Sequence, residues 1–312
     1  MAHEKHLDSP AQPIKSNKDG KRIALVLGSG GARGLAHIGV IQELEARGYR
    51  IDVIAGCSMG ALVGGFYAAG KLDAYTEWAM TLQKLDILKL LDLGGTSGLI
   101  AGQKIMTKLE EWIGDIRIED LPIEYTAVAV DIEREREVWF SKGSLYHAIR
   151  ASIAIPGVFT PHLYKGRILV DGSVLNPIPV APTLRRMTDQ IFVVDANGPP
   201  VSVMPQPEDT DDKPAQGWLS SMARKVGLGS DPDPQTRAKL SAVSVMERSL
   251  DTMMAALTRQ HLAVFQPDMV FRVPRDLFMI HEFHRATEII EMGRQLARDL
   301  LDNPELERQQ KL

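Results

Sequence analysis

The feature that most constrains the fold of this chain is a short apolar run followed at once by a glycine-rich turn and a helical pattern. This combination occurs twice near the start of the sequence. The first run covers residues 22–27 and leads through Gly28 into apolar residues at helical spacing. The second covers residues 51–55 and leads through another glycine turn into a helix over residues 59–69. Because buried parallel strands read as short apolar runs, this pattern predicts alternating strands and helices.

The same alternation continues along the chain and predicts a three-layer α/β/α fold with a mainly parallel central sheet. The further strands are expected at residues 125–130, 138–141, 167–170, 191–195 and 269–273. The further helices are expected at residues 104–113, 236–265 and 283–301.

The ends and one internal segment differ in composition from this regular pattern. Residues 1–20 mix charges, Pro and Gly and lack the apolar core of a secretory signal, so we expect a flexible N-terminal tail. Residues 21–312 are expected to form a single domain. Seven of the 18 prolines fall at residues 199–234 beside an acidic cluster, so we expect a flexible insertion at about 199–235. A short helix around Trp218 and Met222 could serve there as a lid or membrane contact, or pack onto the body.

Charge and hydropathy exclude several classes of protein. The chain has 36 Lys and Arg against 40 Asp and Glu, so it lacks the basic surplus of a nucleic-acid binder. A single cysteine excludes a disulfide scaffold. Residues 53–70 carry no charge, but five glycines and a strand-like start favour a strand, a turn and a buried helix over a transmembrane segment. We therefore expect a cytoplasmic protein that can lie at a membrane surface.

The sharpest motif is Gly56-Cys57-Ser58-Met59-Gly60, a G-x-S-x-G between a predicted strand and a predicted helix. Small residues two positions before and after the serine allow a turn too sharp for a Cβ, which presents the hydroxyl at the top of the sheet. This context favours a nucleophile elbow in which Ser58 attacks and Gly56 and Gly60 shape the turn. A glycine-rich packing turn with an incidental serine would read the same from this motif alone.

A second glycine motif, GSGGARG at residues 28–34, stands directly between the first strand and the first helix. Backbone N–H groups in such a loop, aided by the helix dipole, form a nest for negative charge. A dinucleotide fingerprint would need a glycine where Arg33 stands and an acidic ribose ligand after the second strand. Both are missing, so an oxyanion fits this loop better than a dinucleotide.

A third motif places Asp171 directly after the predicted strand at residues 167–170 and before Gly172 and Ser173. A carboxylate at the C-terminal end of a strand lies on the edge where α/β proteins build their sites. Taken singly, an Asp-Gly pair is more often only a turn. Because this motif follows the other two along the chain, a functional role for Asp171 becomes more credible than for an Asp-Gly pair alone.

Together the three motifs resemble the patatin-like phospholipase family, which pairs a G-G-G-x-R-G loop with a G-x-S-x-G nucleophile and an aspartate in D-G-G or D-G-A. The likeness covers residues 22–195, includes the segments 98–102, 129–131 and 150–157, and is closest to the bacterial branch related to the catalytic domain of neuropathy target esterase. Two departures are Ser29, in place of a loop glycine, and Ser173, in place of the last Gly or Ala. Both are small residues.

The resemblance implies a serine acyl hydrolase that cleaves the carboxylic ester bonds of phospholipids, lysophospholipids or related lipids through an acyl-enzyme. Ser58 would be the nucleophile, and Asp171 its only side-chain partner. The implied oxyanion hole consists of the backbone N–H groups of Gly30, Gly31 and Ala32. An aspartate with an ordinary pKa of about 3.9 is a weak base at neutral pH, so this hole must supply much of the rate. It also replaces a Lewis acid, and no metal or cofactor is needed.

Several side chains leave alternatives open. Arg33 would brace the glycine loop or contact a phosphate headgroup. His37, His147 and His162 could each act as a general base, although structural or exposed positions are commoner. Cys57 could be an alternative nucleophile or, more simply, a small buried packing residue.

The C-terminal part of the sequence also has two readings. Its methionines Met246, Met253 and Met254 favour core packing over a lipid-binding stripe. His281 and His284 with Glu282 have a metal-like spacing, but without further ligands they indicate a helix surface. Beside the hydrolase, a regulatory or scaffold protein of the same fold and a nucleotide-binding oxidoreductase remain as alternative hypotheses.

Overall fold

The computed structural model describes residues 20–90, 103–184, 187–201 and 242–306. The predicted N-terminal tail, apart from its last residue, and most of the predicted insertion at 199–235 lie outside the described residues, as does the short helix around Trp218. Within the described ranges, no helix is both long enough and apolar enough to cross a bilayer. Residues 53–70 form the end of one strand, a turn and a buried helix, which confirms that expectation.

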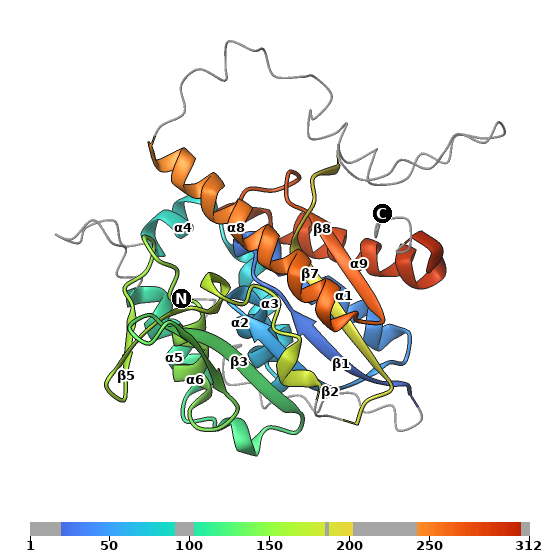
Figure 1. The fold of residues 1–312 in the computed structure, drawn as a ribbon, viewed down its shortest axis with the longest axis horizontal. Coiled ribbons are helices and arrows are strands. Elements are labelled where there is room, and N and C mark those ends of the chain that lie inside the picture. Colours follow the sequence, from blue (N-terminus) through green and yellow to red (C-terminus); the bar gives the residue numbers. More distant parts are fainter. Residues whose placement is uncertain (1–19, 91–102, 185–186, 202–241, 307–312) are drawn as a thin grey trace, which may run out of the picture.

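The described residues form a mixed eight-stranded sheet in the order β5-β6-β3-β2-β1-β7-β8, with β4 paired to β3 (Figure 1). The pairs β1–β2, β1–β7, β2–β3 and β7–β8 are parallel, and the pairs β3–β4, β3–β6 and β5–β6 are antiparallel. The strands are β1 Arg22–Leu27, β2 Arg50–Cys57, β3 Glu124–Asp131, β4 Arg136–Phe140, β5 His162–Tyr164, β6 Arg167–Asp171, β7 Gln190–Gly198 and β8 Met269–Pro274. Every one except the three-residue β5 lies where the sequence predicts a strand.

Helices cover both faces of this sheet. They are α1 Ala36–Ala46, α2 Met59–Ala68, α3 Leu72–Thr81, α4 Lys84–Leu90, α5 Gln103–Ile113, α6 Leu145–Ser152, α8 Ala242–Phe265 and α9 Ala286–Asp302. Short 3₁₀ turns include η1 Gly31–Leu35, η3 Gly172–Val174 and η7 Phe283–Arg285. The sequence pattern does not predict α3, α4 and α6, although it predicts the helices that flank the glycine motifs.

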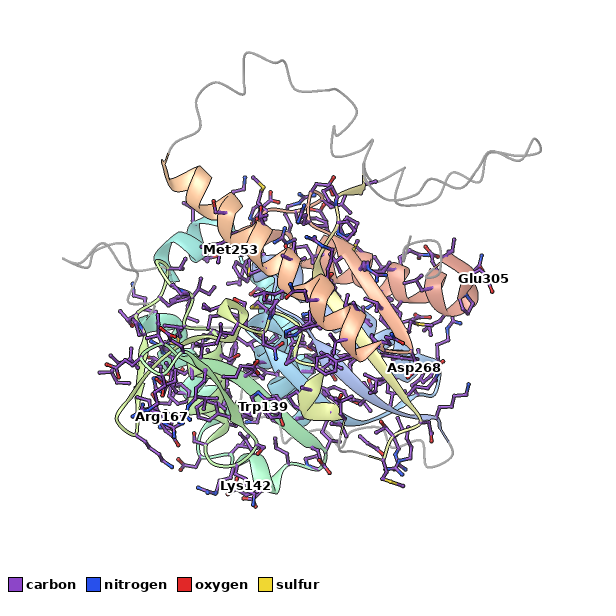
Figure 2. The ribbon with its side chains drawn as sticks, in the orientation of Figure 1. Trp139, Lys142, Arg167, Met253, Asp268 and Glu305 are labelled. Atoms are coloured by element: carbon purple, nitrogen blue, oxygen red, sulfur yellow. The ribbon has the colours of Figure 1, made fainter. Side chains whose placement is uncertain are left out.

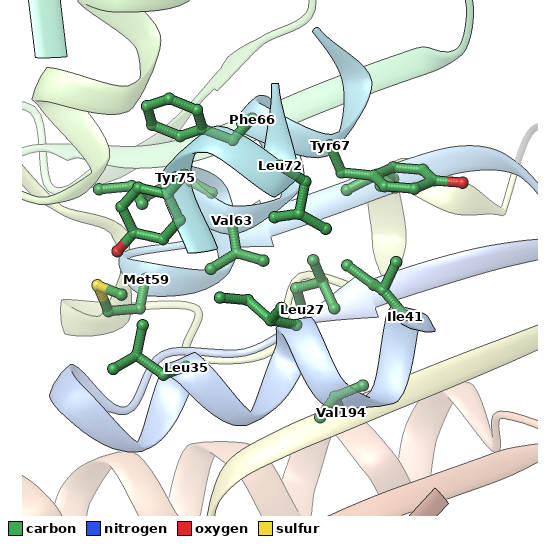
Figure 3. Packing of buried hydrophobic residues seen from close by; sticks show 14 of the residues in the cluster. Leu27, Leu35, Ile41, Met59, Val63, Phe66, Tyr67, Leu72, Tyr75 and Val194 are labelled. Carbon is green, nitrogen blue, oxygen red and sulfur yellow. The ribbon is translucent and has the colours of Figure 1, made fainter. Parts of the chain in front are cut away.

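The core has a large and a small side, divided by the alternation of side chains along the central strands. Leu25 and Leu27 of β1 belong to the large cluster. Figure 3 shows Leu27 among side chains of α1, α2 and α3. Val26 points to the other face and packs with Val193 and Val270 in a small cluster under α8. The predicted three-layer α/β/α architecture is therefore confirmed, with unequal outer layers.

Two strand ends flank β3 and create the site. The parallel strand β2 ends with Cys57 level with Val128, whereas the antiparallel strand β6 ends with Asp171 level with Ala129. Because Val128 and Ala129 are adjacent, β2 and β6 end at nearly the same level on the two sides of β3. The segments that follow these two strand ends then bring Ser58, one residue after Cys57, to the side chain of Asp171.

Candidate active site

The serine turn, residues 56–60, joins β2 to α2 in a strained conformation. Ser58 has φ 55° and ψ −124°, a left-handed φ that costs a non-glycine residue on the order of 1–3 kcal/mol. A Cβ on Gly56 would lie 2.5 Å from the carbonyl oxygen of Gly60, and a Cβ on Gly60 would collide with the carbonyl oxygen of Leu27. Both glycines are therefore required by close backbone approach, as the motif predicts.

A buried serine that sequence reasoning did not assign holds this turn. The backbone N–H of Ser58 donates to Ser152 Oγ at 2.9 Å, and the Ser152 hydroxyl donates to the carbonyl oxygen of Val128 at 2.6 Å. Ser152 stands at the end of α6 and is fully buried. It lies within the 150–157 segment that carries part of the family resemblance, which was the available signal for its importance.

Asp171 is fully buried at the end of β6, and its Oδ1 accepts from the backbone N–H of Ser173 at 2.8 Å. Burial raises the pKa of Asp171 above its ordinary value, although hydrogen bonding from the Ser58 side chain and from Ser173 opposes that shift. Asp171 Oδ2 is buried and has no hydrogen-bond partner among the described residues. The structure thus brings together the alcohol and the carboxylate that the sequence pairs, with one carboxylate oxygen free to take a proton.

Cys57 faces the same carboxylate and behaves as a neutral thiol. Its Sγ donates to Asp171 Oδ1 at 3.7 Å. Burial and the charge of Asp171 raise the pKa of the Cys57 thiol well above its usual range. Because the thiolate is the nucleophilic form of cysteine, this environment disfavours Cys57 as a nucleophile.

The glycine loop, residues 28–34, approaches its surroundings too closely for side chains at two positions. A Cβ on Gly30 would lie 2.6 Å from the Cβ of Ala196, and one on Gly31, whose φ is 56°, would lie 2.6 Å from the carbonyl oxygen of Ile280. The N–H of Ala32 already donates to that Ile280 oxygen at 2.8 Å. Of the three predicted oxyanion donors, Ala32 therefore has its N–H engaged, whereas the N–H groups of Gly30 and Gly31 have no hydrogen-bond partner among the described residues.

Arg33 is buried, and each of its guanidinium nitrogens donates within the protein. Nε reaches the carbonyl oxygen of Gly30 at 3.3 Å, and the two terminal nitrogens reach the carbonyl oxygen of Arg275 at 2.8 Å and Asn197 Oδ1 at 2.7 Å. Asn197 in turn donates its backbone N–H to Asp195 Oδ1 at 2.9 Å. This geometry matches the bracing alternative, because Arg33 fastens the glycine loop to the end of β7 and to the segment after β8.

The histidines considered as alternatives to Asp171 as the general base do not hydrogen-bond to Ser58. His37 is buried with its Nε2 2.8 Å from the carbonyl oxygen of Gly28, and burial lowers its pKa to about 4. His147 and His162 stack at 5.2 Å, and burial together with the nearby Arg150 lowers the pKa of His162 to about 4. Among the described residues, no histidine hydrogen-bonds to Ser58 or Asp171.

A cavity of about 470 Å³ opens from the serine turn and the glycine loop. Ser58, Asp171 and Gly31 lie on its wall, and most other lining side chains are apolar. These come from α2, α3, α5, α8 and the segment that follows α6, among other parts of the chain. A volume in the range of about 300–1,000 Å³ with a few convergent polar groups is typical of a small-molecule site. The arrangement can therefore hold an apolar substrate against a hydroxyl, a carboxylate and two backbone donors.

Two sequence interpretations of the C-terminal part are wrong. Met253 is not core packing, because it is 57% exposed and lines the cavity with Met254. The sulfur of Met254 accepts from Ser29 Oγ at 4.0 Å, and the side chain of Met246 lies outside the described residues. His281 also lines the cavity and is not merely a helix surface, while Glu282 accepts from the backbone N–H of Met279 at 2.8 Å.

Comparison with known proteins adds an independent line of evidence. A family model described as patatin-like phospholipase matches residues 25–184. An uncharacterized NTE family protein of Mycobacterium tuberculosis is 38% identical over 352 aligned positions, which cover 96% of this chain and 97% of that protein. An uncharacterized NTE family protein of Mycobacterium bovis shows the same identity and coverage.

More distant similarity reaches fungal proteins and solved structures. The lysophospholipase nte1 of Emericella nidulans is 27% identical over 296 positions, and the alignment covers 88% of this chain but 18% of that much longer protein. The crystal structure of VipD from Legionella pneumophila matches with a TM-score of 0.43 and 13% identity, covering 94% of this chain and 67% of that one.

Proposed function

Because this chain belongs to the patatin-like phospholipase family and is a lipid carboxylic ester hydrolase, we propose that Ser58 is its nucleophile and Asp171 its general base. The observation that carries this proposal is that β2 and β6 end at the same level on the two sides of β3, with the Ser58 side chain beside a buried carboxylate whose Oδ2 has no hydrogen-bond partner among the described residues. The resemblance to the family had predicted the pairing of Ser58 with Asp171 from the sequence alone.

In the proposed first step, Ser58 Oγ attacks the ester carbonyl carbon while Asp171 Oδ2 accepts the hydroxyl proton. The N–H groups of Gly30 and Gly31 donate to the oxyanion that forms, a contribution typically worth about 3 kcal/mol per donor. Collapse of the intermediate expels the alcohol, which takes the proton from Asp171. Water then attacks the acyl-Ser58 ester with Asp171 again as base, and the fatty acid leaves.

Burial supports this role for an aspartate without histidine. A base works best when its pKa lies near the operating pH, and the raised pKa of Asp171 moves it in that direction. Because the neutral Cys57 thiol and the Ser173 N–H both point at Oδ1, the other oxygen is the one left for the serine proton.

The proposed substrates are phospholipids, lysophospholipids or related lipid esters, taken from a membrane surface by a cytoplasmic protein. Leu250, Met253 and Val174 line the cavity and are also substantially exposed, which suits contact with a lipid surface. The relative in Emericella nidulans is named a lysophospholipase, and we extend this activity to the present chain as part of the proposal.

The test is hydrolysis of lysophospholipid and of a 4-nitrophenyl ester by wild type and Ser58→Ala. We expect the substitution to reduce kcat by about 10⁴-fold or more, because it removes the nucleophile. Ser141→Ala is the matched control, since Ser141 is an exposed serine outside the cavity, and it should keep wild-type activity. A folded Ser58→Ala protein with unchanged kcat would refute the proposal.

A further inference from the structure

We propose that an aromatic wall formed by Tyr75, Trp78 and Trp112 closes the far end of the cavity and sets the longest acyl chain that the enzyme accepts. This inference rests on the proposed function, because it assigns the cavity beyond Ser58 to the acyl chain of the ester. The wall residues all line the cavity, and they come from α3 and α5, away from the strand ends that carry Asp171.

Apolar side chains connect the nucleophile to the wall. Met59 directly follows Ser58 and lines the cavity together with Tyr75. Figure 3 shows Met59, Tyr75 and Phe66 following one another along one side of the core. An acyl chain bound to Ser58 would therefore pass Met59 and meet Tyr75 before it reached the tryptophans.

Other side chains pack against the core side of the aromatic wall, so its rings cannot move easily to admit a longer acyl chain. Trp78 and Trp112 meet edge to face at 4.9 Å, and Phe66 backs both Tyr75 at 4.8 Å and Trp112 at 5.7 Å. Lys71 Nζ donates to the carbonyl oxygen of Trp112 at 2.7 Å and so ties α5 to the start of α3. Phe66, Tyr75 and Trp112 are all buried.

A rigid end wall makes kcat/KM depend on the length of the acyl chain. Each methylene that enters an apolar cavity improves kcat/KM by up to about fourfold, because it leaves water. Once the chain reaches a wall that is packed like a protein core, the next methylene must stay outside or displace aromatic rings, and the gain stops. Activity should therefore rise with acyl length and then level off or fall.

The two tryptophans offer variants of different severity. Trp78 is half-buried, so Trp78→Ala should open the wall with less damage to the core than a change at Tyr75. Trp112→Phe keeps a ring and removes an indole N–H that is buried without a partner, so the protein should fold. Trp139 is 47% exposed on β4 and does not line the cavity, which makes Trp139→Ala a matched control (Figure 2).

The experiment measures kcat/KM for 4-nitrophenyl esters from butanoyl to hexadecanoyl in wild type and the three variants. We expect Trp78→Ala to raise the ratio of hexadecanoyl to octanoyl hydrolysis about tenfold, Trp112→Phe to raise it less, and Trp139→Ala to leave it unchanged. Folded wall variants whose length profiles match the wild type, or an equal change in Trp139→Ala, would overturn the inference. Failure of the proposed function would instead appear as full ester hydrolysis by Ser58→Ala, whatever the length profile.

Discussion

The serine turn and the glycine loop lie at the same edge of the sheet, but they take their support from different parts of the chain. The turn is held by its own glycines and by Ser152, all within the segment that matches the family model. The loop is held by Pro177 within that segment, and by Asn197, Arg275 and Ile280, which come after the segment ends at residue 184. The glycines and Ser152 that support the nucleophile thus lie within the matched segment, whereas the proposed oxyanion donors depend largely on residues beyond it.

This difference explains why the family resemblance is dense around one half of the site and sparse around the other. A sharp turn needs glycines at fixed positions near the serine, and those leave a readable motif. The glycine loop is held in part by backbone carbonyl groups such as that of Ile280. Such a hydrogen bond fixes where the backbone of the supporting segment runs, but it does not require a particular side chain there. Sequence comparison therefore identifies the glycine loop but does not identify most of the residues that hold it in place.

The comparison is tested most strongly at Asn197, which lies on β7 and does not itself line the cavity, although it holds Arg33, which does. Asn197→Ala removes the acceptor for Arg33, so the loop that carries Gly30 and Gly31 should lose its position. We expect kcat to fall about 100-fold, within the cost of losing one oxyanion donor, while KM changes little.

A conservative variant separates this positioning role from general damage. Asn197→Asp keeps the acceptor oxygen and removes an N–H that is buried without a partner. It should restore most of the kcat lost in Asn197→Ala. Unchanged kcat in Asn197→Ala, measured with protein of wild-type thermal stability, would mean that the loop does not depend on the C-terminal part.

Ser152 tests whether the serine turn is as self-supporting as its glycines suggest. Ser152→Ala leaves the buried Ser58 N–H and the Val128 carbonyl oxygen without their partner, at an expected cost of about 1–3 kcal/mol in the free energy of unfolding. Because the glycines still fix the turn, kcat should fall only about tenfold. A kcat loss larger than that of Asn197→Ala, measured in the same assay, would reverse the comparison.

The smallest expected effect is a change in stability with pH at Asp171. Its folded-state pKa is raised by burial, so the folded protein keeps this proton at a pH where the unfolded chain has released it. Stability therefore falls as pH rises from the ordinary carboxylate pKa through the raised one, and the full cost is present above it. Asp171→Asn avoids this cost and should be more stable than wild type.

Urea denaturation at about pH 8 and about pH 4 checks that sign, since the advantage of Asp171→Asn should shrink at the lower pH. An advantage that grows on acidification would show that the buried carboxylate stabilises the fold. Ionisation of the buried Asp171 would then not lower the free energy of unfolding.

Much of the fold and of the site could be predicted from the sequence because the informative patterns are local. The strand ends beside Ser58 and Asp171 follow from short apolar runs and the turns after them. The helix α6 was missed, although Ser144 accepts from the N–H of His147 as an N-cap, a signal that the sequence does contain. The Ala32 hydrogen bond to Ile280 could not be foreseen, because it joins segments whose approach depends on the whole sheet.

The exposed Met253 shows a second limit of the sequence. Its helical spacing reads as core packing, but α8 covers a cavity as well as the small side of the sheet. Apolar periodicity tells which face of a helix avoids water in isolation, and it does not distinguish a protein core from a substrate cavity.

The central claim is that Asp171 takes the proton of Ser58, and the rate at which a fluorophosphonate modifies Ser58 measures this most directly. Mass spectrometry of the modified peptide should find the label on Ser58 in wild type, and Asp171→Asn should react about 10⁴-fold more slowly while remaining folded. Equal labelling rates in the two proteins, or a label carried by another residue, would contradict the account.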